Sequence, residues 1–202
     1  YYRMGVRMIC LTHNGNNCVA DAAMDSLETH GGLSPFGYQV IQEMNRLGMI
    51  VDVSHASRKT CLQAVQASKT PVMASHSGVY NLKKIPRNLT DEEIIAIASR
   101  GGLIQISIGR YFLSNLPKAE VGMEHLLEHI NYVVDLVGID HVGIGSDFDG
   151  GGGIEGVEDM GKMKAITRAL LEQGYTEGEI GKLWGGNVLR VMEEVARNAD
   201  GF

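Results

Sequence analysis

The sequence has few cysteines and prolines for its length. Of its 202 residues, 3 are cysteine and 4 are proline. Cys10, Cys18 and Cys61 are odd in number and form no Cys-x-x-Cys pair, which argues against a disulfide scaffold and against a thiolate zinc site. Such cysteine usage is typical of a reducing compartment, so we expect a cytoplasmic protein.

Other absences exclude whole classes of partner. No apolar stretch approaches about 18 residues, so we expect no segment to span a membrane. The formal net charge is −6 and there is no Lys/Arg-rich run, which argues against a nucleic-acid-binding surface. A P-loop sequence is also absent. Residues 151–156 match G-x-G-x-x-G, but nearby acidic side chains would repel a pyrophosphate there.

The residues that are present predict one domain of alternating strands and helices. With 44% hydrophobic residues, the chain can build one core, and we expect residues 1–202 to form a single domain. Short apolar runs predict strands at residues 6–11, 49–54, 71–75, 103–108 and 141–145. Amphipathic runs predict helices at residues 38–47, 58–68, 90–99, 122–137, 157–173 and 176–197. This alternation predicts a parallel sheet with crossover helices, in either a doubly wound sheet or a (β/α)8 barrel.

Polar residues at the strand ends distinguish these two architectures. His13, His55, His76 and Asp147 each stand at or just after the end of a different predicted strand. A barrel brings the carboxyl ends of all its strands to one rim, whereas an open sheet concentrates functional groups at one switch point. Four separate strand ends with such residues therefore favour the barrel.

The repeated pair Ser-His is the strongest indication of a metal site. It occurs as Ser54-His55 and Ser75-His76, after successive predicted strands. One histidine after a strand is more often an ordinary loop residue, but two such imidazoles on neighbouring strands can share one zinc ion. Asp147 stands directly at a strand end, while the next acid, Asp149, precedes a glycine as turn residues do.

A second motif competes with this site. His125, Glu128 and His129 fit the H-x-x-E-H pattern of some zinc peptidases, in which both imidazoles lie on one helix face. The alternative is the solvated face of a crossover helix, with Leu126 and Ile130 turned inward. A barrel places such a helix in its outer ring, which favours the second interpretation. A non-catalytic module with only binding or structural roles is a further alternative.

The sequence as a whole resembles the membrane (renal-type) dipeptidases and their bacterial relatives, peptidase family M19. The likeness extends through residues 5–7, 11–14, 31–37, 43–49, 51–55, 71–77, 86–91, 145–150 and 186–191. It implies a (β/α)8 TIM barrel of the metal-dependent hydrolase type. It also implies hydrolysis of dipeptides, with two zinc ions at the rim.

The resemblance also implies a role for each candidate residue. His55 and His76 match the two histidines that bind the second zinc. His13 matches a histidine that contacts the substrate and helps to hold the developing oxyanion. Arg87 matches an arginine that binds the carboxylate at the substrate's C-terminus. Asp147 matches an aspartate near the substrate amino group and the catalytic water.

One feature of the family cannot be assigned to a single residue of this sequence, and another is absent from it. The family has an aromatic residue after the next strand, where Tyr111 and Phe112 both stand, so that role is open. Its His-x-Asp pair and bridging glutamate are not found in this sequence. The resemblance then implies that the five strands are the last five of eight, and that the chain alone is inactive or needs the missing segment. Because an incomplete barrel exposes strand edges, we expect a homo-oligomer or association with that segment.

Overall fold

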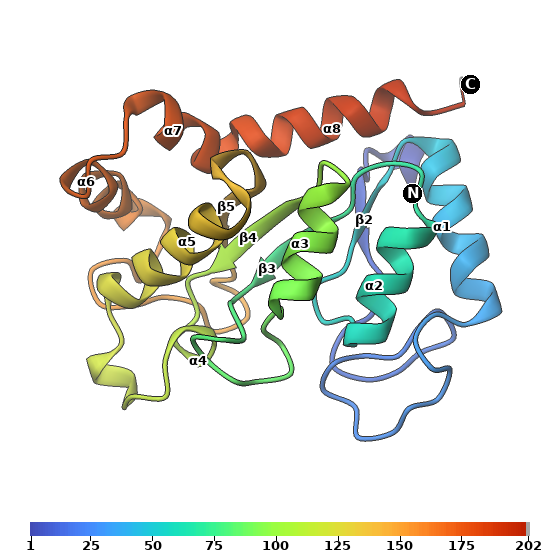
Figure 1. The fold of residues 1–202 in the computed structure, drawn as a ribbon, viewed down its shortest axis with the longest axis horizontal. Coiled ribbons are helices and arrows are strands. Elements are labelled where there is room, and N and C mark those ends of the chain that lie inside the picture. The colour runs from blue at the N-terminus through green and yellow to red at the C-terminus, as the bar shows by residue number, and fades with distance from the viewer. Residues whose placement is uncertain (201–202) are drawn as a thin grey trace.

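Five parallel strands, adjacent in chain order, form one sheet in the computed structural model, which describes residues 1–200 (Figure 1). They are β1 (Met8–Cys10), β2 (Ile50–Asp52), β3 (Met73–Ser77), β4 (Leu103–Ser107) and β5 (Val142–Ser146). Every neighbouring pair is parallel. The order never reverses, which is the arrangement of a barrel rather than a doubly wound sheet. Within the described residues the sheet is open, with β1 and β5 at its edges.

The helices follow the strands as crossover connections. They are α1 (Pro35–Leu47), α2 (Arg58–Ala67), α3 (Asp91–Ser99), α4 (Arg110–Leu113), α5 (Met123–Val137), α6 (Lys164–Glu172), α7 (Glu177–Gly181) and α8 (Asn187–Arg197). Short 3₁₀ turns lie at Tyr2–Met4, Lys118–Glu120, Ile139–His141 and Met160–Lys162. Figure 1 shows α1, α2, α3 and α5 side by side against the sheet, and α8 across one end of it. No helix within residues 1–200 has the length and apolar character needed to cross a membrane.

Local capping signals explain where several helices begin and end. The hydroxyl oxygens of Ser34 and Ser57 accept a backbone N–H in the first turns of α1 and α2. Thr90 and Thr176 each form a capping box with the glutamate three residues later. Gly48 ends α1 with a left-handed φ of 74°. These are short-range interactions, so the sequence pattern reveals them.

Two apolar clusters stabilise the sheet. The main core lies between the sheet and its helices and includes fully buried Ile41, Ile94, Ile104, Leu126 and Ile130. A smaller cluster joins the start of the strands to α8 through residues Ile50, Met73, Leu103, Val191 and Val195. The first cluster fixes the strands against the helices. The second covers the end of the sheet opposite the carboxyl ends of the strands.

The last helices differ from the prediction. The sequence predicts one helix over residues 176–197, whereas a π-helical segment, Lys182–Gly186, separates α7 from α8. The Asn187 side chain donates to the carbonyls of Ile139 and Val142, and Trp184 Nε1 donates to Thr167 Oγ1. These contacts with distant elements hold the irregular segment in place. The preceding helix is also shorter than predicted, since α6 begins at Lys164 rather than near residue 157.

Candidate functional site

A cavity of about 870 Å³ opens at the carboxyl ends of the strands. Its lining includes all five residues singled out from the sequence, namely His13, His55, His76, Arg87 and Asp147. His13, His55, Arg87 and Asp147 come from segments that follow β1, β2, β3 and β5, whereas His76 lies within β3, near its carboxyl end. The barrel-like strand order therefore brings residues more than 130 positions apart in the sequence to one rim.

Three imidazole rings stand together in this cavity. The ring centroids of His13 and His55 are 4.3 Å apart, and those of His55 and His76 are 5.0 Å apart. The Nε2 atoms of His55 and His76 approach to 3.0 Å. Each Nδ1 atom has another partner: Asn14 Oδ1 at 3.1 Å for His55, and Ser75 Oγ at 2.8 Å for His76. The two Nε2 atoms are therefore turned toward the same point.

Electrostatics keep these two rings neutral near pH 7. Burial, the positive charge of Arg87 and the neighbouring imidazoles together lower the pKa of His55 to about 3, and burial has the largest effect. Burial and Arg87 also lower the pKa of His76, although Asp147 and Asp52 act in the opposite direction. A neutral imidazole has a free lone pair, which is the form that binds a divalent metal.

The donor set fits part of a metal site. Two converging imidazole nitrogens are typical zinc ligands, and a tetrahedral site needs about four donors. Among residues 1–200, no three His, Cys, Asp or Glu side chains are grouped so that they could hold an ion. His55 and His76 therefore account for two donors. Any others would be water, substrate atoms or groups outside these residues.

Backbone strain is concentrated at the same rim. Within residues 1–200, the non-glycine residues with positive φ are His55 at 64°, Ser146 at 38° and Asp147 at 73°. This left-handed conformation costs an L-residue about 1–2 kcal/mol. Local hydrogen bonds hold it: the Ala23 N–H donates to His55 O, and the Gly152 N–H donates to Asp147 O. Strain that is retained at several positions around one cavity indicates a functional constraint there.

Arg87 places a buried cation beside the imidazoles. Its side chain is only 4% exposed, and its guanidinium carbon lies 5.1 Å from the centroid of the Phe112 ring. Burial lowers the pKa of Arg87 below its ordinary value, although a guanidinium remains protonated in proteins. Nη2 donates to the His76 carbonyl at 3.2 Å. The planar fork has five N–H groups, so donors remain for an anion that enters the cavity.

The two aromatic candidates occupy different places. Phe112 is 8% exposed and packs against Arg87, while Tyr111 is 49% exposed and its ring centroid lies 5.2 Å from Lys83 Nζ. Both line the cavity. Phe112 therefore fixes the position of Arg87, and Tyr111 is the aromatic side chain accessible from solvent.

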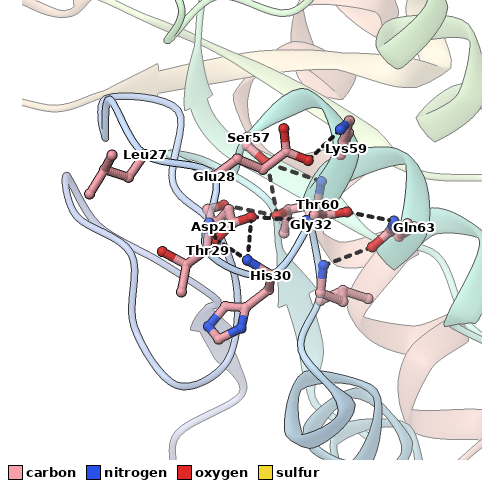
Figure 2. Close-up of polar contacts among 12 residues, drawn as sticks. Asp21, Leu27, Glu28, Thr29, His30, Gly32, Ser57, Lys59, Thr60 and Gln63 are labelled. Atoms are coloured by element: carbon pink, nitrogen blue, oxygen red, sulfur yellow. Dashed lines mark hydrogen bonds and ion pairs between the residues drawn. The ribbon is translucent and has the colours of Figure 1, made fainter.

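A loop of residues 14–34 forms one wall of the cavity and was not identified from the sequence. Asn14, Asn17 and Met24 of this loop line the cavity. The Asp21 carboxylate, 3% exposed, accepts the backbone N–H groups of Thr29, His30 and Gly32, each at 3.0 Å. Figure 2 shows these bonds converging on Asp21.

Helix α2 anchors the loop from the other side. Thr60 Oγ1 donates to the Asp21 carbonyl at 2.8 Å, and Gln63 bonds to both Gly31 O and Leu33 N. Glu28 forms an ion pair with Lys59 (Figure 2). The loop is thus fixed to a helix that follows His55.

The competing H-x-x-E-H motif does not form a metal site. His129 is fully buried, its Nδ1 accepts the Val79 N–H at 2.9 Å, and its Nε2 donates to Leu113 O at 3.0 Å. His125 Nδ1 instead accepts the Gly122 N–H at 3.3 Å. The solvated-face interpretation is also wrong for His129, although the expected inward position of Leu126 and Ile130 is confirmed. His129 therefore joins α5 to the end of α4 and to the loop that follows β3.

The cysteines are free, as the sequence predicts. Cys10 is half-buried, and its Sγ lies 2.8 Å from Ser54 O. Burial and the nearby Asp52 raise the pKa of the Cys10 thiol to about 12. A thiol in that state is a poor nucleophile at neutral pH.

Comparison with known proteins gives one consistent family. The sequence model of the family described as membrane dipeptidase (peptidase family M19) matches residues 1–201. The chain is 38% identical over 196 residues to dipeptidase tcpJ of Claviceps purpurea, and 40% identical over 196 residues to dipeptidase verJ of Clonostachys rogersoniana. Each alignment covers 96% of this chain but only 46% and 50% of the relatives. The chain thus spans about half the length of the curated relatives it matches.

Solved structures agree with the sequence relatives. The probable dipeptidase PvdM from Pseudomonas aeruginosa is 33% identical with a TM-score of 0.93, over 96% of this chain and 64% of that one. A metallo peptidase from Rhodobacter sphaeroides, liganded with a phosphinate mimic of the dipeptide L-Ala-D-Ala, is 29% identical with a TM-score of 0.89, over 96% and 57%. The five strands therefore form part of a barrel of the TIM type.

Proposed function

The chain belongs to the membrane dipeptidase family, peptidase family M19, and on that premise we propose that it takes part in metal-dependent hydrolysis of dipeptides. One observation carries the proposal. The five residues that match the family's functional positions line one cavity, and two of them, His55 and His76, bring their Nε2 atoms within 3.0 Å.

We propose that the metal is zinc, with two ions in the complete site and one of them held by His55 and His76. The neutral, converging imidazoles support this assignment. When bound, two such metal ions would lower the pKa of a water molecule and polarise the scissile carbonyl.

The remaining side chains would bind and orient the substrate. Arg87 would pair with the C-terminal carboxylate, because a guanidinium fork matches two carboxylate oxygens. His13, whose ring lies beside that of His55, would donate an N–H to the oxygen of the scissile carbonyl as negative charge develops there. The Asp147 carboxylate would face the substrate ammonium group and accept a proton from the attacking water.

A test of carboxylate recognition is available from Arg87. Hydrolysis of a dipeptide and of its C-terminal amide would be compared in the purified full-length gene product with added zinc. Arg87→Ala should lower kcat/KM for the free acid about 10- to 100-fold, as expected for loss of a charged hydrogen bond. The amide should be a poor substrate of both forms.

The matched control is Lys84→Ala, which removes an exposed cation from the same loop outside the cavity. It should leave kcat/KM unchanged. Equal hydrolysis of the acid and the amide by the unsubstituted protein would contradict the assignment of Arg87. Absence of any dipeptide hydrolysis with zinc present would contradict the proposed activity itself.

A further inference from the structure

A buried hydrogen-bond relay leads from Asp52 to His76. Asp52, at the end of β2, is 3% exposed, and its Oδ1 accepts the backbone N–H groups of Ser54 at 2.9 Å and Ser75 at 3.0 Å. Its Oδ2 lies 2.5 Å from Ser75 Oγ. The same Ser75 Oγ lies 2.8 Å from His76 Nδ1. The relay, defined as Asp52, Ser75 and His76, therefore crosses from β2 to β3.

Counting hydrogens determines the direction of every bond in this relay. A carboxylate only accepts, so the single proton of Ser75 Oγ is donated to Asp52 Oδ2. Ser75 Oγ can then only accept from its other two neighbours, Ser54 Oγ at 3.2 Å and His76 Nδ1 at 2.8 Å. Ser54 Oγ in turn accepts the His76 backbone N–H at 3.0 Å. His76 must therefore carry its ring proton on Nδ1.

We propose that Asp52 and Ser75 are positioning residues that hold His76 in the Nδ1–H tautomer, with the Nε2 lone pair directed at the metal position. The part of this inference that concerns metal rests on the proposed function. The tautomer itself follows from the hydrogen bonds alone.

The neighbouring His55 explains why the tautomer matters. Its Nδ1 lies 3.1 Å from Asn14 Oδ1, so a proton on Nδ1 leaves its Nε2 lone pair facing His76. If His76 carried its proton on Nε2, it would donate directly to His55 Nε2, only 3.0 Å away. The two Nε2 atoms would then form a hydrogen bond with each other, and neither would have a lone pair free for a metal ion. The relay prevents donation from His76, and the Asn14 contact with His55 Nδ1 prevents donation from His55, so two lone pairs remain for a cation.

Asp52→Asn gives a specific test. The two backbone N–H groups would keep the amide oxygen at the Oδ1 position, so the amide nitrogen would stand beside Ser75 Oγ and donate to it. Ser75 would then turn its own proton toward His76 Nδ1. We expect the ring proton of His76 to move to Nε2. The ¹⁵N chemical shifts of the two ring nitrogens, measured on the metal-free protein at about pH 8 where imidazoles are neutral, report this change directly.

Two substitutions at Ser75 test the same relay in case Asp52→Asn fails to fold. Ser75→Ala should leave His76 without its acceptor and give a mixture of tautomers, whereas Ser75→Thr should restore the Nδ1–H form. The control is Ser77→Ala, which removes a fully buried hydroxyl of the same strand that has no hydrogen-bond partner. It should leave the His76 signals unchanged.

Zinc affinity, measured by competition with a chromophoric chelator, is the second readout. We expect Asp52→Asn and Ser75→Ala to weaken zinc binding about 10- to 100-fold, the usual effect of losing such a partner. An Nε2–H tautomer in the unsubstituted protein, or one that Asp52→Asn does not change, would overturn the relay. A confirmed tautomer without zinc binding or dipeptide hydrolysis would instead refute the proposed function and leave the relay intact.

Discussion

At the scale of single residues, the seven histidines show how surroundings decide the role of one side-chain type. His55 and His76 keep one ring nitrogen for the cavity, because their Nδ1 atoms are bonded elsewhere. His129 uses both ring nitrogens on backbone groups and is fully buried. The same residue type is thus a candidate ligand at two positions and a structural connection at the third.

The burial of His129 predicts a pH-dependent loss of stability. Burial lowers its pKa in the folded state to about 4, with His125 and Lys83 acting in the same direction and the bond to Leu113 opposing it. Since the unfolded-state pKa is about 6.5, the unfolded chain binds a proton first as pH falls. This contribution to stability is therefore complete above about pH 6.5 and is lost toward pH 4, by about 3 kcal/mol in all.

Urea unfolding of the unsubstituted protein and of His129→Gln, at about pH 7.5 and about pH 4.5, measures this effect. The difference in unfolding free energy between the two pH values should be smaller in the variant. His30→Gln, which replaces an exposed histidine, is the control and should retain the original difference. An unchanged difference in His129→Gln would show that this residue does not couple to folding.

At the scale of elements, the loop of residues 14–34 depends on one carboxylate. Burial tends to raise the pKa of Asp21, but the N–H groups of Gly32, His30 and Thr29 outweigh it and lower the pKa below its ordinary value. The charged form therefore stabilises the loop. The loop also contains Asn14, which is hydrogen-bonded to His55. The conformation of the loop therefore affects the position of His55 in the cavity.

Asp21→Asn should destabilise this loop. An amide offers one acceptor oxygen, and its nitrogen would face N–H donors, so we expect a loss of about 2–3 kcal/mol. Hydrogen exchange at the amides of Thr29, His30 and Gly32 should be faster, with little change in β4. The control is Asp135→Asn on α5, an exposed carboxylate, which should affect neither measurement. Unchanged exchange at the three amides would exclude this role for Asp21.

Local sequence signals predicted the strands, most helix ends and four of the five cavity residues, whereas Arg87 was predicted only from the family resemblance. Thr90 and Gly48 act within one turn of a helix, and His13, His55, His76 and Asp147 follow from strand ends, so short stretches of sequence suffice. The relay from Asp52 was missed because it depends on how β2 and β3 align. The π-helical segment before α8 was missed because its contacts, from Trp184 and Asn187, reach distant elements.

At the scale of the whole molecule, the open sheet is the dominant feature. Among residues 1–200, β1 and β5 each pair with one neighbour, and Met8 on β1 is 38% exposed. Unpaired strand edges favour association with other strands. The chain's coverage of about half of its relatives agrees with a sheet that does not close on itself.

A protein of residues 1–202 should therefore associate in a concentration-dependent way, as measured by sedimentation velocity. Met8→Lys places a charge on the edge strand and should weaken this association, because edge charges oppose strand pairing. Met160→Lys, at a position 70% exposed outside the strands, is the control and should not. A monomer at all concentrations would contradict the expectation.

The left-handed backbone at His55, Ser146 and Asp147 has a consequence for protein engineering. Replacement by glycine at any of the three positions would relieve this steric cost, although the greater freedom of glycine in the unfolded chain would offset part of the gain. Two of these replacements would remove a side chain from the cavity. At His55 and Asp147, relief of backbone strain would therefore come at the expense of the proposed chemistry.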